Sequence, residues 1–597
     1  MLTCFSKCSA WHSIKYIDPA ESGAVLPILH VNGFKISERT IFGCMDDKEL
    51  VSLFSGYGYQ VIMVGDLDDI EVELFSAMHW SVAEIKRIQA DARSGTAIVK
   101  PRWPMIILKT PKGWSGPKKV DGEFIEGSFR SHQVPVPDAN KDEAHLKIVQ
   151  EWLQSYEIGS LLPNGNPNKS IISILPKQES RRLGQAHTTL DPHQALSMPT
   201  WEPFAVKKGD WASSMATVGQ FLGQVSKENP SSFRLFSPDE LESNKLSAIL
   251  ENGGRNFQWD QYSRAQGGRV IEILSEHCCQ GFMQGYTLTG RTALFPSYES
   301  FLGIIHTMMT QYSKFNKVAR QVKWRGQLSS LNYIETSTWA RQEHNGFSHQ
   351  QPSFIGAILN LKAEAARVYL PPDANCFLST VHHCLQSRNY VNLMVGSKQP
   401  TMVYLSPEEA AEHCRVGVSV WDFASNKQGQ PDVVLVGIGV EVTFEVIKAA
   451  ELLRELAPDL LVRVINVTDL MVLATESSHP HALSQSQFTS LFTDDKPILF
   501  NYHGYQTELQ GLLFGRPGTH RMDVQGYKEE GTTTTPFDMM LVNKLSRFHL
   551  AIRAVTCAQR LETSATTNKS ELVEQVQAKL DSAREYILAE GKGKYCH

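Results

Sequence analysis

Two histidines five residues apart are prominent among the side chains that could do chemistry. His344 and His349 flank Asn345-Gly346, a dipeptide typical of turns. Metal-binding histidine pairs on a helix are four residues apart, so this spacing argues against a helical zinc site. Imidazoles on a turn could move protons near neutral pH. From this motif alone, the alternative to a catalytic role is that both histidines are structural and hydrogen-bonded.

A run of four threonines is the second unusual feature. It lies in residues 526–538, with the sequence GYKEEGTTTTPFD, between Gly531 and Pro536. Such a segment serves no ordinary core, and we expect it to be functional. Its hydroxyls could cap a helix that starts near Pro536, or could face a partner subunit.

These segments, together with residues 121–134, 275–277 and 288–291, resemble phosphoketolase, a family of thiamine-diphosphate enzymes. The resemblance covers nearly the whole chain, including residues 343–349. It implies cleavage of xylulose 5-phosphate or fructose 6-phosphate by inorganic phosphate, which gives acetyl phosphate and an aldose phosphate. It also implies a homodimer or higher homo-oligomer, with cofactor sites between subunits.

The resemblance assigns three residues to the aminopyrimidine ring of the cofactor. Glu276 matches the activating glutamate, whose carboxyl shares a proton with the ring; alone, it could equally be a surface residue of a helix beginning at Arg269. Tyr298 falls where the family packs the ring, although it could be a core aromatic. Arg291 agrees with the family, but Thr292-Ala293 replaces the usual His-Gly, and we expect this departure to alter the local site.

The same resemblance implies a catalytic set that handles protons and oxyanions. His344 and His349 would line the substrate channel, where an imidazole can hold a sugar phosphate. His132 and Lys112 also match active-site positions of the family, and their side chains could stabilise negative charge and help expel water. Lys112 could instead be a solvated lysine after a strand.

Phosphate binding is assigned to two further segments. Ser243-Asn-Lys245 corresponds to a Ser-Asn-Arg turn of the family, but lysine offers a point charge where arginine offers a bidentate fork. We therefore expect weaker phosphate binding there. Lys398 resembles another phosphate contact and could partly compensate.

The diphosphate site is predicted to be incomplete. Asn32 matches the second of two magnesium ligands in the family, while the Gly-Asp-Gly motif with the first would fall before Met1. Trp11 and His12 match the residues that follow that motif. We therefore expect thiamine diphosphate and Mg²⁺ as cofactors, a truncated first domain and poor activity of this chain, because Mg²⁺ demands near-ideal octahedral oxygen geometry.

Composition restricts the classes of function. The chain has 597 residues, 42% hydrophobic content and a net charge of -5 with scattered basic residues, which does not indicate nucleic-acid binding. No stretch approaches the roughly 20 apolar residues of a membrane-spanning helix. Ten cysteines are too sparse for a disulfide scaffold. A cytoplasmic enzyme of small molecules is the expected class.

The elements that position these residues follow from apolar patterning. Apolar runs at residues 24–30, 61–64 and 105–108 predict buried strands, and residues 71–92 have helical spacing. Residues 433–439, a helix to residue 457 and residues 461–466 predict a second parallel sheet.

The fold class is therefore α/β, with three parallel-sheet or mixed-sheet domains of the transketolase-like thiamine-diphosphate-binding architecture, the first incomplete. The expected ranges are 1–160 for a truncated diphosphate-binding domain, 161–235 for a linker, 236–407 for the pyrimidine-binding domain and 408–597 for the C-terminal domain.

Two alternatives remain open at this point. One is a transketolase-like enzyme in which a second sugar accepts the two-carbon unit. The other is a catalytically impaired fragment or paralogue that acts only as a partner subunit, which the missing magnesium aspartate, Thr292 and Lys245 favour.

Overall fold

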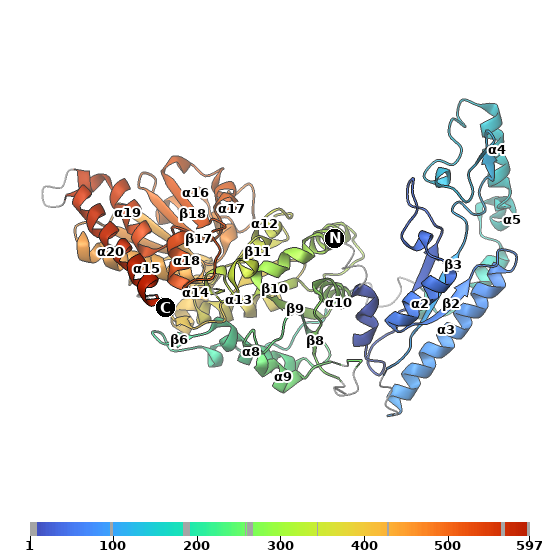
Figure 1. Cartoon of the computed structure of the whole chain (residues 1–597), viewed down its shortest axis with the longest axis horizontal. Helices are drawn as coiled ribbons and strands as arrows, with labels where there is room; N and C mark the ends of the chain where they lie inside the picture. The colour runs from blue at the N-terminus through green and yellow to red at the C-terminus, as the bar shows by residue number, and fades with distance from the viewer. Residues whose placement is uncertain are drawn as a thin grey trace. The chain divides into compact units, whose positions relative to one another are not determined.

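The computed structural model describes residues 9–95, 100–182, 191–256, 258–259, 267–342, 344–426, 429–562 and 568–593 (Figure 1). Glu343 lies outside these described residues. The chain divides into two compact units, residues 1–186 with 256–267 and residues 187–255 with 268–597. Among the described residues, no helix is both long and apolar enough to cross a membrane.

The first unit contains a three-stranded parallel sheet in the order β1-β3-β2. Its central strand is apolar, and Met105, Ile106 and Ile107 are fully buried. These elements agree with the strands and the long helix predicted from apolar spacing. Their bounds are β1 Ile28–Val31, β2 Gln60–Val64, β3 Pro104–Lys109, α2 Asp47–Tyr57 and α3 Ile70–Arg93.

The rest of the first unit consists of short elements. They are η1 Trp11–Tyr16, η2 Phe42–Cys44, β4 Lys119–Val120, β5 Glu123–Phe124, η3 Phe129–Ser131, α4 Glu143–Gln154, α5 Ile158–Leu161, η4 Pro163–Gly165, α6 Lys169–Ile174 and η5 Glu179–Arg181.

The second unit contains a six-stranded sheet in the order β11-β12-β10-β9-β7-β8, in which every pairing is parallel. Its strands are β7 Phe233–Ser237, β8 Val270–Glu272, β9 Thr292–Ser297, β10 Leu331–Glu335, β11 Ala366–Tyr369 and β12 Val391–Val395. Its helices are η6 Glu202–Phe204, α8 Ser214–Glu228, α9 Ser247–Gly253, α10 Glu276–Leu288, η7 Glu299–Ile305, α11 His306–Arg320, η8 Trp339–Arg341, η9 Gly346–His349, α12 Phe354–Leu359 and α13 Ala374–Gln386.

A five-stranded mixed sheet, in the order β14-β16-β15-β17-β18, completes the second unit together with the small antiparallel pair β6 and β13. The strands are β6 Trp211–Ala212, β13 Thr401–Met402, β14 Val418–Val420, β15 Val433–Ile438, β16 Val462–Val467, β17 Ile498–Tyr505 and β18 Met522–Tyr527. The helices are α14 Pro407–Val416, α15 Val440–Leu456, η10 Leu470–Leu473, α16 Gln485–Phe492, α17 Gln506–Leu513, η11 Thr519–Arg521, α18 Pro536–Val542, α19 Arg547–Cys557, η12 Gln559–Glu562 and α20 Lys569–Glu590. Figure 1 shows α15, α19 and α20 lying together beside this sheet.

The structure differs from the predicted linker over residues 161–235. Residues 214–228 form α8, whose Met215, Val218, Phe221 and Val225 are fully buried in the second unit. These positions recur at helical spacing, but Thr217, two glycines and two glutamines between them hide the pattern. The helix predicted to begin at Arg269 is also different, because strand β8 comes first and α10 begins at Glu276.

Acid is expected to destabilise the second unit through His413. This imidazole is 4% exposed, and its ring nitrogens bind Ser419 Oγ at 2.7 Å and Asn466 Oδ1 at 2.9 Å. Burial lowers the pKa of His413 to about 4. Because the folded pKa lies below the unfolded value of about 6.5, the stabilisation is present above pH 6.5 and is lost as the pH falls towards 4.

The expected loss from His413 is about 2 kcal/mol of unfolding free energy between pH 7.5 and pH 5. Urea unfolding at the two pH values measures it. The variant His413→Asn should show a smaller difference between the two pH values, and an equal or larger difference would contradict this assignment.

Candidate active site

The candidate residues of the second unit lie at one edge of the six-stranded sheet. Ser243 follows β7, Glu276 follows β8, Tyr298 follows β9, His349 follows β10, and Lys398 follows β12. All these strands are parallel, so their carboxyl ends share an edge. Ligands of open α/β sheets bind at that edge.

Tyr298 is held by contacts from the loop after β7. Asp239 Oδ2 accepts two hydrogen bonds, one from the backbone N–H of Tyr298 and one from Ser297 Oγ, both at 3.0 Å. The hydroxyls of Tyr298 and Ser243 lie 3.2 Å apart. Sequence reasoning missed Asp239, which lies two residues after the end of β7 in a loop without a recognisable motif. Burial raises the pKa of the Asp239 carboxyl.

Lys398 places a cation over the same tyrosine. Its Nζ lies 4.3 Å from the centre of the Tyr298 ring, and the residue is only 7% exposed. The charge of Lys398 favours the ionised form of Asp239. A nearly buried ammonium with an aromatic neighbour and a nearby hydroxyl suits an anionic group such as phosphate.

His349 completes this cluster. Its ring centre lies 5.9 Å from that of Tyr298 and 5.0 Å from that of Phe301. Ser348 Oγ lies 2.9 Å from His349 Nδ1. Burial lowers the pKa of His349; the charge of Asp239 opposes this effect, and the charges of His344 and Lys398 add to it. The neutral imidazole that results can accept a proton near pH 7.

Glu276 is the first residue of α10, and Ser275 caps the helix by accepting from Cys278 N–H. Burial raises the pKa of the Glu276 carboxyl, and the charge of Asp239 raises it further. No side chain of the described residues is recorded as a hydrogen-bond partner of this carboxyl. It is therefore a half-buried acid with a raised pKa beside Asp239.

Three other predicted residues lie away from this cluster or at its margin. Arg291 precedes β9 at the opposite end from Tyr298, donates to Ser231 O at 3.0 Å, and lies over the Tyr286 ring. The departure at Thr292 is at that same far end, where β9 begins. His344 is exposed on the turn, and Lys245 is exposed with a positive φ of 61°.

The first unit brings its own candidates to one sheet edge. Asn32 follows β1 and Lys112 follows β3, and these strands are parallel neighbours. Lys112 Nζ lies 3.4 Å from His132 Nδ1 and also binds the carbonyl of Lys35. Asn32 Oδ1 accepts from Phe34 N–H at 3.2 Å. The pairing of Lys112 with His132, residues twenty positions apart, comes from the fold.

A buried group in the second unit could offer metal ligands. Potential ligand atoms of Glu299, Glu335 and His503 lie within 4.8 Å of one another. Burial raises the pKa of both glutamates and lowers that of His503 to about 4. His503 and Glu299 already hydrogen-bond each other directly. We therefore assign a structural role to this pair: it links Glu299, the residue after Tyr298, to His503 in strand β17.

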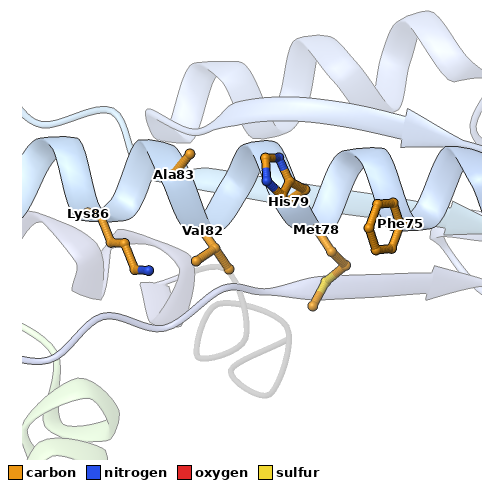
Figure 2. A pocket seen from close by; sticks show the side chains of 6 residues that line it. All are labelled: Phe75, Met78, His79, Val82, Ala83 and Lys86. Carbon is orange, nitrogen blue, oxygen red and sulfur yellow. The ribbon is translucent and has the colours of Figure 1, made fainter. Parts of the chain in front are cut away.

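A shallow hollow of about 380 Å³ lies along α3 in the first unit (Figure 2). Its lining is mostly apolar, with His79 and Lys86 at its margin. Among the described residues, its lining contains no acidic side chain and belongs to one helix. The hollow therefore offers no catalytic constellation. The lining residues are Phe75, Met78, His79, Val82, Ala83 and Lys86.

Solved structures with a similar fold are transketolases. Transketolase from Leishmania mexicana has a TM-score of 0.60 at 14% identity, covering 94% of this chain and 75% of that one. The Pichia stipitis enzyme in complex with sedoheptulose 7-phosphate has a TM-score of 0.58 at 15% identity, with the same coverage. The fold thus defines a protein of the transketolase-like α/β class.

Sequence comparison narrows this class. The model of D-xylulose 5-phosphate/D-fructose 6-phosphate phosphoketolase matches residues 216–387, and models of the N-terminal and C-terminal domains of this family match residues 6–193 and 398–595. A probable phosphoketolase of Schizosaccharomyces pombe is 52% identical, covering 97% of this chain and 70% of that protein. One of Rhodopseudomonas palustris strain HaA2 is 45% identical, covering 93% and 72%. The chain belongs to the phosphoketolase family, whose members are aldehyde-lyases.

The expectation of a truncated first domain gains no support from these matches, because the N-terminal domain model matches from residue 6 onward. Thiamine diphosphate is the cofactor that the family and fold imply. The residues at this sheet edge fit its ring, since Glu276 supplies a carboxyl with a raised pKa that, within the described part of the chain, has no side-chain hydrogen-bond partner. For Mg²⁺, the predicted ligand Asn32 supplies a neutral oxygen.

Proposed function

We propose that this chain cleaves xylulose 5-phosphate or fructose 6-phosphate with inorganic phosphate. The products are acetyl phosphate, water and glyceraldehyde 3-phosphate or erythrose 4-phosphate. The observation that carries the proposal is the cluster in which Lys398, Ser243 and His349 surround Tyr298. It combines a phosphate-binding cation with a neutral base, as a sugar phosphate substrate requires.

Thiamine diphosphate, when bound, supplies a stabilised carbanion that can add to a ketose carbonyl. Glu276 would face its aminopyrimidine ring, and its raised pKa favours keeping a proton on the carboxyl. Tyr298 would pack against the ring. Asn32 would bind Mg²⁺ through its side-chain oxygen, with water and phosphate oxygens as the other ligands.

His349 would take the proton of a sugar hydroxyl at one ring nitrogen during carbon-carbon cleavage, because its imidazole is neutral at pH 7. His344 would assist from the exposed part of the same turn. Ser243 and Lys398 would hold the phosphate of the substrate, and Lys245 would add an exposed positive charge. In the first unit, the paired Lys112 and His132 would stabilise an oxyanion and help remove water.

Acetyl phosphate formation by the purified chain tests the proposal. The assay contains xylulose 5-phosphate, inorganic phosphate, thiamine diphosphate and Mg²⁺, with an active phosphoketolase as positive control. Phosphate-dependent product above background is expected. Absence of product would reject the proposed function, and product that needs a second sugar in place of phosphate would assign two-carbon transfer.

Lys398→Met is expected to raise the KM for the sugar phosphate about 10- to 100-fold, because a charge-assisted contact contributes about 1.5–3 kcal/mol. Methionine keeps the apolar stem but removes the charge over Tyr298. Steady-state kinetics with varied ketose measures the effect, and Lys227→Met, an exposed lysine of α8, is the matched control. Equal KM values in the two variants would remove Lys398 from the phosphate site.

The proposal includes a homodimer or larger homo-oligomer in the cytoplasm. Reduced, sparse cysteines suit that compartment. Sedimentation of the purified chain measures its oligomeric state.

A further inference from the structure

The threonine segment, residues 531–535, packs against the histidine turn, residues 344–350. Gln350 Nε2 donates to Thr532 O at 3.1 Å, and Tyr527 Oη donates to Gln350 O at 3.0 Å. Thus the threonine segment binds the end of the turn that carries His349.

Two glycines allow these segments to approach closely. A Cβ on Gly346 would stand 2.7 Å from Thr533 Oγ1, and one on Gly531 would stand 3.3 Å from Phe347 Cα and 2.5 Å from Gln350 Oε1. Because 2.7 and 2.5 Å are shorter than real non-bonded Cβ contacts, a side chain at Gly346 or Gly531 would force the facing Thr533 or Gln350 side chain to move. The threonine segment and the histidine turn therefore each have a glycine, Gly531 and Gly346, where the other segment packs against it.

The threonine segment is itself firmly anchored. Thr535 caps α18 by accepting from Asp538 N–H at 3.2 Å, and Thr534 Oγ1 donates to Asp538 Oδ2 at 2.7 Å. Phe537, Met539 and Met540 of α18 are buried. On the other side the segment continues from β18. The predicted helix cap near Pro536 is confirmed, and it fixes one side of the contact.

We propose that residues 531–535 act as a positioning element that holds the histidine turn so that His349 faces Tyr298. The inference rests on the proposed function for the role of His349. Because the segment follows β18 and the turn follows β10, the five-stranded sheet thereby sets the geometry of a residue at the edge of the six-stranded sheet.

The test uses Gly346→Ala together with changes at Thr533. Displacing a catalytic group by about 1 Å can cost about 100-fold in rate, so Gly346→Ala should lower kcat/KM about 10- to 100-fold. Adding Thr533→Ala removes Oγ1 and should restore most of the loss. Adding Thr533→Val keeps a methyl group where Oγ1 stood and should restore none. Failure of alanine to rescue better than valine would overturn the proposal.

Backbone strain needs its own control, because Gly346 has a φ of +66°. Gly591 has a φ of +62° with nothing within 4 Å of its ideal Cβ. Gly591→Ala therefore introduces positive-φ strain without a contact, and it should leave kcat/KM unchanged. An equal loss in Gly346→Ala and Gly591→Ala would also overturn the proposal.

A second readout does not depend on activity. The rate at which diethyl pyrocarbonate modifies His349, followed by peptide mass spectrometry and normalised to the exposed His306, should rise in Gly346→Ala. It should return towards the wild-type value with Thr533→Ala but not with Thr533→Val. If the wild-type chain forms no acetyl phosphate, the proposed function fails, and the modification rates still decide whether the threonine segment positions the turn.

Discussion

Replacing Glu276 with glutamine is expected to lower kcat for acetyl phosphate formation about 10²- to 10⁴-fold, the range of general acid–base catalysis. Glutamine has the same shape but cannot hold or release a proton at that position. The structure supplies the reason for a large effect, since burial and Asp239 both favour the protonated carboxyl. A carboxyl whose pKa is raised releases its proton less readily, so it can share that proton with a ring nitrogen.

The measurement is kcat at saturating ketose, phosphate and cofactor, with thermal unfolding of the same preparations. Glu251→Gln is the matched control, because Glu251 is an exposed residue of α9 at the surface of the same unit. We expect the control to keep wild-type kcat. If Glu276→Gln retained more than a tenth of the activity, Glu276 would not be the proton-sharing residue.

His349→Asn is the second change with a large expected effect, about 10²- to 10⁴-fold in kcat. Asparagine keeps hydrogen-bonding capacity but cannot accept a proton near neutral pH. Burial lowers the pKa of His349, so the neutral base persists to a lower pH than the usual value of about 6.5. In the wild type, kcat should therefore fall only below pH 6.5, as the imidazole becomes protonated.

The pH profile separates this role from simple packing. In the wild type, kcat should fall as the pH drops below 6.5, which is the acid limb of the profile. The variant should lack this limb, so its residual kcat should not change over the same pH range. His306→Asn, at an exposed position of α11, should keep both kcat and the limb. An unchanged acid limb in His349→Asn would assign that titration to another group.

Local patterning predicted the elements whose signals are strong within a few residues. Residues 71–92 became α3 because apolar side chains recur at helical spacing, and residues 105–108 became β3 because a continuous apolar run suits a buried parallel strand. Helix α8 was missed, since its buried Met215 and Phe221 are separated by weak helix formers such as Thr217 and Gly219. Tertiary packing compensates for that weak local preference.

In the candidate site, too, local motifs indicated single residues, while the tertiary structure brought them together. Motifs indicated Glu276, Tyr298, His349 and Lys398 one at a time, yet no spacing connects residues that are more than a hundred positions apart. Asp239 escaped notice because a single acid in a loop carries no pattern, and only its bond to Tyr298 N–H gives it a role.

The sequence by itself determined the family and the chemistry of the candidate groups, and it proposed a helix start near Pro536, because these depend on residue identity and near neighbours. Only the tertiary structure decided that Lys398 lies over Tyr298, that Arg291 lies at the far end of β9, and that the threonine segment holds the histidine turn. The physical reason is that parallel strands bring distant loops to one edge, and the ordering of strands in a sheet is not encoded in any local pattern.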